Sequence, residues 1–440
     1  MQRGTLGFWM CTALVVGNMI GSGVFLLPAS LAPYGGISII GWLITAAGAM
    51  LLALVFARLS RLVPRAGGPY AYTRYGFGDF AGFLVAWGYW ISIWAGNAAI
   101  SIAFTGYLGV FLPGITRSAL LSAGTALTAV WFLTWINSRG VRNAGIVQVV
   151  TTILKLVPLA AVGILGLLYL RVENFIPFNL SGGSGYSAIT ATATLTLWAF
   201  LGLESATIPS GEVKDPGRTI PRATIVGTLL TAVIYILGTV AVMGVIPPDI
   251  LATSTAPFAD AASLMWGEWA AYGVAAGAAI SCFGALNGWI LLQGQLPLAV
   301  EADGLFPRLF GRIGSRGTPT MGLIVSSLLI TILVGMNFTR SLVELYTFII
   351  LLATLTTLIP YLFSTAAELL IFIQERERFE GRRMWGAASI AILALAYSLW
   401  AITGIGREPL IWGAILLLCG VPAYLFLGRS RRSIDTEQTA

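Results

Sequence analysis

The sequence contains no histidine and only three cysteines among its 440 residues. Without histidine the chain lacks the commonest metal ligand and the usual titrating group near neutral pH. Cys11, Cys282 and Cys419 are far apart in apolar segments, so we expect neither a disulfide framework nor a metal site. No cofactor is predicted. An enzyme is disfavoured, because no arrangement of a nucleophile with a base is visible.

Charged residues are also scarce, at 10% of the chain against about 25% in a typical soluble domain. Hydrophobic residues make up 57%, and apolar runs of roughly 20 residues recur along the whole length. Each run is long enough to cross the hydrocarbon layer of a bilayer, and continuous runs of this length form helices rather than barrel strands. The sequence therefore predicts an all-α membrane protein surrounded by the lipid bilayer.

The hydrophobic runs and the proline, glycine and charged residues between them predict twelve transmembrane helices. The expected spans are 7–33, 36–60, 80–112, 117–137, 144–170, 187–210, 223–246, 265–298, 320–338, 343–373, 384–404 and 408–427. We expect both termini in the cytoplasm, because this leaves only Arg117, Arg171, Arg340 and Arg407 on the outside. The net charge of +7 is then explained by basic residues in the cytoplasmic loops, which set the orientation of the helices, and no nucleic-acid partner is expected.

Two of the predicted helices carry glycine and polar residues at their centres. The first span reads GNMIGSG at 17–23, and the sixth places Gly202 two residues before Glu204. Glycine costs about 1 kcal/mol against alanine in a helix interior, and unwound backbone in lipid leaves amides unpaired. Close packing through small residues is the alternative explanation. The consecutive GSG favours unwinding.

Breaks at corresponding positions in two halves of a chain are typical of transporters with a binding site at the membrane midplane. A half-helix N-terminus presents free N–H groups and a positive dipole end, which suit a carboxylate. Free carbonyl groups at the opposing break suit an ammonium group. Two such breaks side by side predict a binding site for an α-amino acid.

Four segments resemble the amino acid–polyamine–organocation superfamily, and the likeness runs nearly from end to end. They are GNMIGSGVFLLPASLA at 17–32, PRAGGPYAYTRYGFG at 64–78, LWAFLGLESAT at 197–207 and GWILLQGQ…ADGLFP at 288–307. Within that superfamily the sequence is most similar to the bacterial arginine/agmatine antiporters. The resemblance implies the leucine-transporter fold with a 5+5 inverted repeat and discontinuous first and sixth helices. It assigns 1–170 to the first repeat, 187–373 to the second, 384–427 to two further helices that form a homodimer contact, and 428–440 to a cytoplasmic tail.

The resemblance also assigns a substrate site. The α-carboxylate would meet Ser22 and Gly23, and the α-ammonium would meet the carbonyl groups of Met19, Trp198 and Leu201. The substrate side chain would lie against Ser92, Ile93, Asn97, Ile100, Trp198, Trp289 and Ala353. The two tryptophans suit a planar cation, at about 0.5–2 kcal/mol each when desolvated.

Ile93 and Ala353 stand where the arginine/agmatine pattern has a thiol and a hydroxyl group. The predicted side-chain pocket is therefore more apolar than in that pattern. A weaker arginine site and a site for a larger neutral or aromatic amino acid are both consistent with these residues.

Glu204 would form a cytoplasmic gate with Tyr89 and Tyr361, by the same resemblance, and could take up a proton there. The alternative is a carboxylate that is simply satisfied by backbone amides at the break.

Lys155 lies about 18 Å along the fifth span, near the midplane, where a cation is costly. It resembles a lysine that replaces the bound ion in proton-coupled and sodium-independent members of the superfamily. There it would contact carbonyl groups near 17–21 and a hydroxyl group such as that of Ser281. A permanent ammonium would make sodium unnecessary, whereas an ammonium that loses its proton could carry the coupling proton.

The leading prediction is a secondary active transporter in the bacterial inner membrane that exchanges arginine for agmatine by alternating access. Its partners would be a small amino acid or polyamine and the bilayer. A proton-coupled or sodium-independent transporter of neutral or large amino acids is the first alternative. A sensor that binds amino acids without transporting them is the second, and it is disfavoured because no sizeable cytoplasmic domain is visible.

Overall fold

The computed structural model describes residues 6–63, 67–139, 144–207, 213–314, 317–337, 339–375 and 381–426. Within these ranges every regular element is a helix, apart from one isolated bridge between Leu6 and Val213. Ten helical stretches there are long and apolar enough to cross a membrane. The prediction of an all-α membrane protein is confirmed.

The first half of the chain contains α1 (Phe8–Met19), α2 (Gly23–Leu31), η1 (Ala32–Ile37), α3 (Ser38–Leu62), α4 (Pro69–Phe77), α5 (Asp79–Leu108), α6 (Gly114–Arg117), α7 (Ala119–Ser138), α8 (Ala144–Leu165), η2 (Gly166–Tyr169) and η3 (Val172–Phe175). The second half begins with α9 (Gly185–Leu197), η4 (Trp198–Phe200), η5 (Ser205–Thr207), α10 (Pro216–Val245), α11 (Pro248–Leu251), α12 (Pro257–Trp266) and α13 (Glu268–Ala302). It ends with η7 (Arg308–Gly311), α14 (Thr320–Asn337), α15 (Leu342–Gln374), α16 (Gly381–Ile402) and α17 (Arg407–Leu418).

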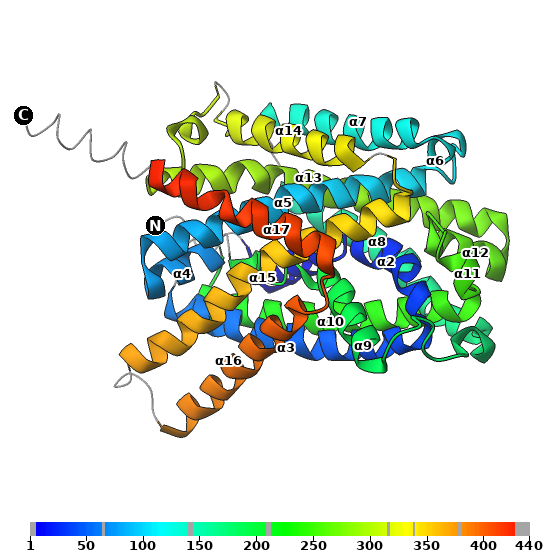
Figure 1. Cartoon of the computed structure of the whole chain (residues 1–440), viewed down its shortest axis with the longest axis horizontal. Helices are drawn as coiled ribbons and strands as arrows, with labels where there is room; N and C mark the ends of the chain where they lie inside the picture. The colour runs from blue at the N-terminus through cyan, green and yellow to red at the C-terminus, as the bar shows by residue number, and fades with distance from the viewer. Residues whose placement is uncertain are drawn as a thin grey trace, which may run out of the picture.

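The helix α5 forms the centre of the bundle and is buried nearly all round. It packs most extensively against α13 and α15 (Figure 1). The pair α7 and α14 lies along one edge of the bundle, and α16 extends away from the opposite corner (Figure 1). A helix that is hydrophobic all round belongs in the interior of such a bundle, and this explains the weak apolar periodicity of α5.

Several boundaries differ from those predicted. The helix α10 begins at Pro216 rather than at 223, because a proline at the first helical position has a suitable fixed φ and needs no hydrogen bond for its nitrogen. Four short helices, α4, α6, α11 and α12, lie in segments that the hydropathy pattern predicted as loops. The predicted cytoplasmic tail, 428–440, lies outside the described residues.

Both predicted breaks are present in the backbone. The first helix ends at Met19, Ile20 leaves the helical region with φ −78° and ψ 82°, and the chain becomes helical again at Gly23. The second break follows η4, where Leu201 has φ −64° and ψ 134° and Gly202 has φ 103°. The two interruptions leave backbone groups without helical partners inside an otherwise apolar bundle.

Candidate functional site

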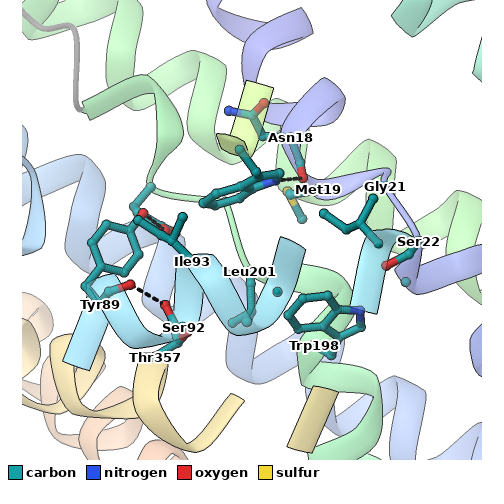
Figure 2. A pocket seen from close by; sticks show the side chains of 15 residues that line it. Asn18, Met19, Gly21, Ser22, Tyr89, Ser92, Ile93, Trp198, Leu201 and Thr357 are labelled. Atoms are coloured by element: carbon teal, nitrogen blue, oxygen red, sulfur yellow. Dashed lines mark hydrogen bonds between the residues drawn. The ribbon is translucent and has the colours of Figure 1, made fainter. Parts of the chain in front are cut away.

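A cavity lies between the two breaks, and residues of α5, α13 and α15 complete its lining. Its lining residues are Asn18, Met19, Gly21, Ser22, Gly23, Tyr89, Ser92, Ile93, Gly96, Ile100, Trp198, Leu201, Glu204, Trp289 and Thr357. In Figure 2, Ser22 and Trp198 lie on one side of the cavity, and Tyr89, Ser92 and Thr357 lie on the other. Eleven of the fifteen predicted substrate and gating residues thus line a single cavity.

The Ser22 end of the cavity suits an anion. The Ser22 hydroxyl group is buried and has no hydrogen-bond partner among the described residues. The helix α2 begins at Gly23, so its first N–H groups have no carbonyl partner within the helix. A Cβ atom on Gly23 would lie 2.9 Å from the Cα of Ala199, and this close approach leaves room only for glycine. An exposed helix N-terminus beside a free hydroxyl group is a typical carboxylate site.

The carbonyl groups of the first break are held by side chains from distant helices. The Tyr235 hydroxyl group donates to the Met19 carbonyl oxygen at 2.6 Å, and the Tyr346 hydroxyl group donates to that of Ser22 at 3.1 Å. These two tyrosines on α10 and α15 were not found from the sequence, because tyrosine within an apolar helix gives no distinctive local signal. The Met19 oxygen has a second lone pair for a substrate ammonium.

Lys155 is buried and braces the same break from α8. Its Nζ donates to the carbonyl oxygens of Gly17 at 2.5 Å and Ile20 at 2.7 Å. The expected contact with the Ser281 hydroxyl group is not formed, since that hydroxyl group has no hydrogen-bond partner among the described residues. The expected contacts with carbonyl groups of the unwound backbone are the ones that the ammonium makes.

Glu204 is fully buried, and each of its carboxylate oxygens accepts a hydrogen bond from a tyrosine. The Tyr89 hydroxyl group donates to Oε1 at 2.7 Å, and the Tyr361 hydroxyl group donates to Oε2 at 2.8 Å. Tyr361 does not line the cavity, so the carboxylate separates this tyrosine from the cavity. The three side chains join the second break to α5 and α15.

The two tryptophans of the cavity lie on different elements, Trp198 on η4 at the second break and Trp289 on α13. The Trp198 ring packs against Gly96, where a Cβ atom would lie 2.9 Å from its Cη2 atom, and its Nε1–H has no partner among the described residues. Trp289 Nε1 donates to the Asn18 carbonyl oxygen at 3.4 Å, a long contact with the first break. Both rings therefore present apolar surface to the cavity.

Asn97 and Ala353 do not line the cavity. Asn97 Nδ2 instead donates to Gln293 Oε1 at 2.7 Å, and Gln293 Nε2 donates to Ser327 Oγ at 3.0 Å. The hydroxyl group that position 353 lacks is supplied nearby, because Thr357, one turn further along α15, does line the cavity. Thr357 was not found from the sequence, because its only local signal is a polar residue within an apolar helix.

Replacing Gly202 by alanine is expected to lower thermal stability and exchange together. Gly202 has φ 103°, and an added Cβ atom would lie 3.3 Å from both the Asn18 carbonyl carbon and the Trp289 ring. A residue with a Cβ atom pays about 1–2 kcal/mol in such a conformation. Gly273→Ala on α13 is the matched control, because a Cβ atom there meets nothing within 4 Å. Equal melting temperatures for the two variants would contradict this explanation of the second break.

Among the described residues, no group of three acidic, cysteine or histidine side chains is arranged to hold a metal ion. The arrangement consists of an anion-binding helix end, aromatic walls and one buried carboxylate, all placed where two membrane helices are interrupted. Fold and site together define a membrane protein that binds a small charged molecule within the bilayer.

Comparisons with known proteins agree with that class. The family model described as amino acid permease matches residues 6–428. The chain is 36% identical to the cadaverine/lysine antiporter of Escherichia coli over 413 residues, which cover 91% of this chain and 89% of the relative. It is 33% identical to a putrescine transporter of Haemophilus influenzae, with 96% and 97% covered, and 35% identical to a putative arginine/ornithine antiporter of Bacillus subtilis, with 96% of each covered.

The chain therefore belongs to the amino acid permease family, as the sequence motifs indicated. It is a multi-pass membrane transporter of the antiporter type and not an enzyme.

Proposed function

We propose that this transporter exchanges a cationic amino acid for a diamine or a decarboxylated amine by alternating access, in a bacterial inner membrane. The observation that carries the proposal is the position of Glu204, the one charged side chain among the described residues that line the cavity. The relatives are named for lysine with cadaverine, for putrescine, and for arginine with ornithine. Arginine with agmatine is one pair of this kind.

The proposed pose places the substrate across the cavity. The α-carboxylate lies at Ser22 and the first amides of α2, and the α-ammonium lies at the carbonyl groups of Met19 and Leu201. The distal cation extends between Trp198 and Trp289 towards Glu204. A diamine lacks the carboxylate and leaves the helix end to water. One of its ammonium groups keeps the carbonyl partners, and the other keeps the aromatic rings and Glu204.

We propose twelve spans with a 5+5 inverted repeat for the membrane domain. Counting α1–α2 and α3 separately and including α8, which supplies a shorter apolar helix, raises the ten stretches to twelve. The contacts support a repeat, because several contacts between the two halves recur when the corresponding helices of the halves are exchanged. The contact of α3 with α9 corresponds to the contact of α10 with α1. The contact of α7 with α13 corresponds to the contact of α14 with α5, and the contact of α15 with α5 corresponds to the contact of α8 with α13.

The positions of the arginines support a cytoplasmic location for both termini. A homodimer contact on α16 and α17 also remains part of the proposal. Large apolar side chains on these helices, including Ile392, Leu393 and Leu418, are exposed and available for a partner helix.

Exchange in proteoliposomes tests the function. Vesicles loaded with lysine, arginine, ornithine or a neutral amino acid would be diluted into labelled cadaverine, putrescine or agmatine, with the direction also reversed. We expect uptake of an amine only against a cationic amino acid or another amine. Leucine and phenylalanine are the competing substrates, because the apolar Ile93 lines the cavity. Uptake that depends on either of them would contradict the proposal and support neutral amino-acid transport.

Replacing Trp198 by leucine is expected to raise the KM for cationic substrates without unfolding the transporter. One aromatic face for a desolvated cation contributes about 0.5–2 kcal/mol, so the expected rise is roughly 2- to 30-fold. Trp135→Leu is the matched control, since Trp135 lies on the half-exposed side of α7. An unchanged KM for every cation in the Trp198 variant would show that this ring does not contact the substrate.

A further inference from the structure

A second hollow lies on the outer side of the bundle, between α5, α14, α15 and α17. This groove has a volume of about 810 Å³ and no lining residue in common with the substrate cavity. Its walls are largely apolar and include Ile332, Met336, Leu352 and Leu416. Ile332 and Met336 are strongly exposed, so the groove opens towards the hydrocarbon of the bilayer. Its shape and lining suit an acyl chain.

A charged pair closes one end of the groove. Arg340 follows α14 and Glu408 lies in the first turn of α17, and the Arg340 guanidinium group donates to both carboxylate oxygens of Glu408. The guanidinium carbon also lies 4.6 Å from the centre of the Phe348 ring. About 31% of the Arg340 side chain and 52% of the Glu408 side chain remain exposed. Both charges can therefore contact a further molecule while they stay paired.

The groove contains one unsatisfied donor. Trp94 on α5 lines it and is 4% exposed, yet its Nε1–H has no hydrogen-bond partner among the described residues. A buried N–H group without an acceptor costs free energy in a membrane, where water does not replace the missing partner. An occupant with a carbonyl group near its polar end would satisfy this donor.

We propose that the groove binds one phospholipid with a zwitterionic amine headgroup, of the phosphatidylethanolamine type. An acyl chain fills the apolar walls, the phosphate lies on Arg340, the ammonium lies on Glu408, and a glycerol ester carbonyl accepts from Trp94 Nε1. Arginine recognises phosphate through its planar set of donors. A headgroup without an amine offers no cation to the exposed part of the Glu408 carboxylate.

Arg340 and Glu408 also line a larger pocket of about 1820 Å³ together with Tyr34 and Glu344. A soluble zwitterion could reach the same pair from there, so the test must separate a lipid from a free headgroup. Glycerophosphoethanolamine, which has no acyl chains, is the suitable competitor.

Quenching of tryptophan fluorescence by brominated lipids tests the proposal in proteoliposomes of the full chain. The fluorescence of Trp94 is obtained as the difference in tryptophan fluorescence between the unmodified protein and its Trp94→Phe variant. We expect brominated phosphatidylethanolamine to quench this signal at a several-fold lower mole fraction than brominated phosphatidylglycerol does. Trp135→Phe is the control, because the half-exposed Trp135 ring, which contacts Arg139, lies outside the groove and should show no preference for phosphatidylethanolamine. Glycerophosphoethanolamine should not relieve the quenching.

Two variants of the charged pair complete the experiment. Arg340→Gln should lower the affinity for both lipids about tenfold, because both headgroups carry the phosphate that Arg340 binds, and the preference for phosphatidylethanolamine should remain. Glu408→Gln should lose only the discrimination against phosphatidylglycerol. Native mass spectrometry should detect one retained phosphatidylethanolamine per chain, and a melting curve shows whether each variant is folded. Equal quenching of the unmodified protein by both lipids would overturn the proposal. So would relief of the quenching by glycerophosphoethanolamine, or a lipid-free dimer in which Trp94 fluorescence is not quenched.

Discussion

Replacing Lys155 by methionine is expected to abolish exchange and to lower the apparent melting temperature of the transporter. The Lys155 ammonium is the donor to two carbonyl groups, those of Gly17 and Ile20, that the unwound backbone has released from helical pairing. Methionine fills a similar volume and donates nothing, so both buried carbonyl groups lose a partner at about 1–3 kcal/mol each. Since α1 also forms one wall of the cavity, the substrate site is lost with the brace.

The control is Lys214→Met, which removes an equal charge from an exposed position before α10. It should leave both the melting temperature and the exchange rate unchanged. Replacing sodium by choline should not affect the unmodified transporter, because the ammonium already holds the carbonyl groups that a cation would otherwise bind. A Lys155→Met variant with normal exchange and normal pH dependence would show that Lys155 is neither a brace nor a proton carrier.

Replacing Glu204 by glutamine is expected to slow exchange roughly 10- to 100-fold, since a hydrogen bond to a charged group contributes about 1.5–3 kcal/mol. The carboxylate accepts from Tyr89 and Tyr361 at once. A glutamine amide keeps one acceptor and offers a donor in place of the other, so one tyrosine hydroxyl group must accept instead of donating, and both hydrogen bonds to a charged carboxylate are lost. The cavity also loses its negative charge, and a diamine with two positive charges should lose more affinity than an amino acid.

Initial rates of exchange measured from pH 5 to pH 8 test this role. The Glu204→Gln rate should no longer vary over the interval in which the unmodified rate varies. Glu173→Gln is the control, since Glu173 is an exposed carboxylate in η3. If the Glu204 variant kept both its rate and its pH profile, the carboxylate would be a satisfied structural group, which was the alternative drawn from the sequence.

The breaks could be predicted from the sequence, because their signal is local. Glycine and small polar residues in the middle of an apolar span are costly, so Gly17–Gly23 and Gly202 indicate an interrupted helix without any knowledge of the neighbours. The groups that stabilise the first break carry no such signal. Tyr235 and Tyr346 lie more than 200 residues along the chain from the carbonyl groups that they hold.

The sequence also did not show which face of each helix points into the cavity. The helix α5 is buried on almost every side, so its sequence does not reveal which face meets the cavity. Asn97 was expected to contact substrate, because a polar residue at mid-membrane suggests a ligand. In the structure it belongs to a hydrogen-bond network with Gln293 on α13. Ile93 and Gly96, which lack polar groups, line the cavity in its place.

Two cryo-EM structures of the full chain, one with saturating lysine and one with cadaverine, would show directly whether substrate binds between the two helix breaks. We expect ligand density between the two breaks. The lysine carboxylate should lie at Ser22 and the amide of Gly23, and the distal ammonium should lie on the side of Glu204 and Tyr89. Cadaverine should occupy the same cavity without contacting the α2 N-terminus. An empty cavity, with density instead in the pocket lined by Arg340 and Glu344, would contradict a substrate site between the breaks.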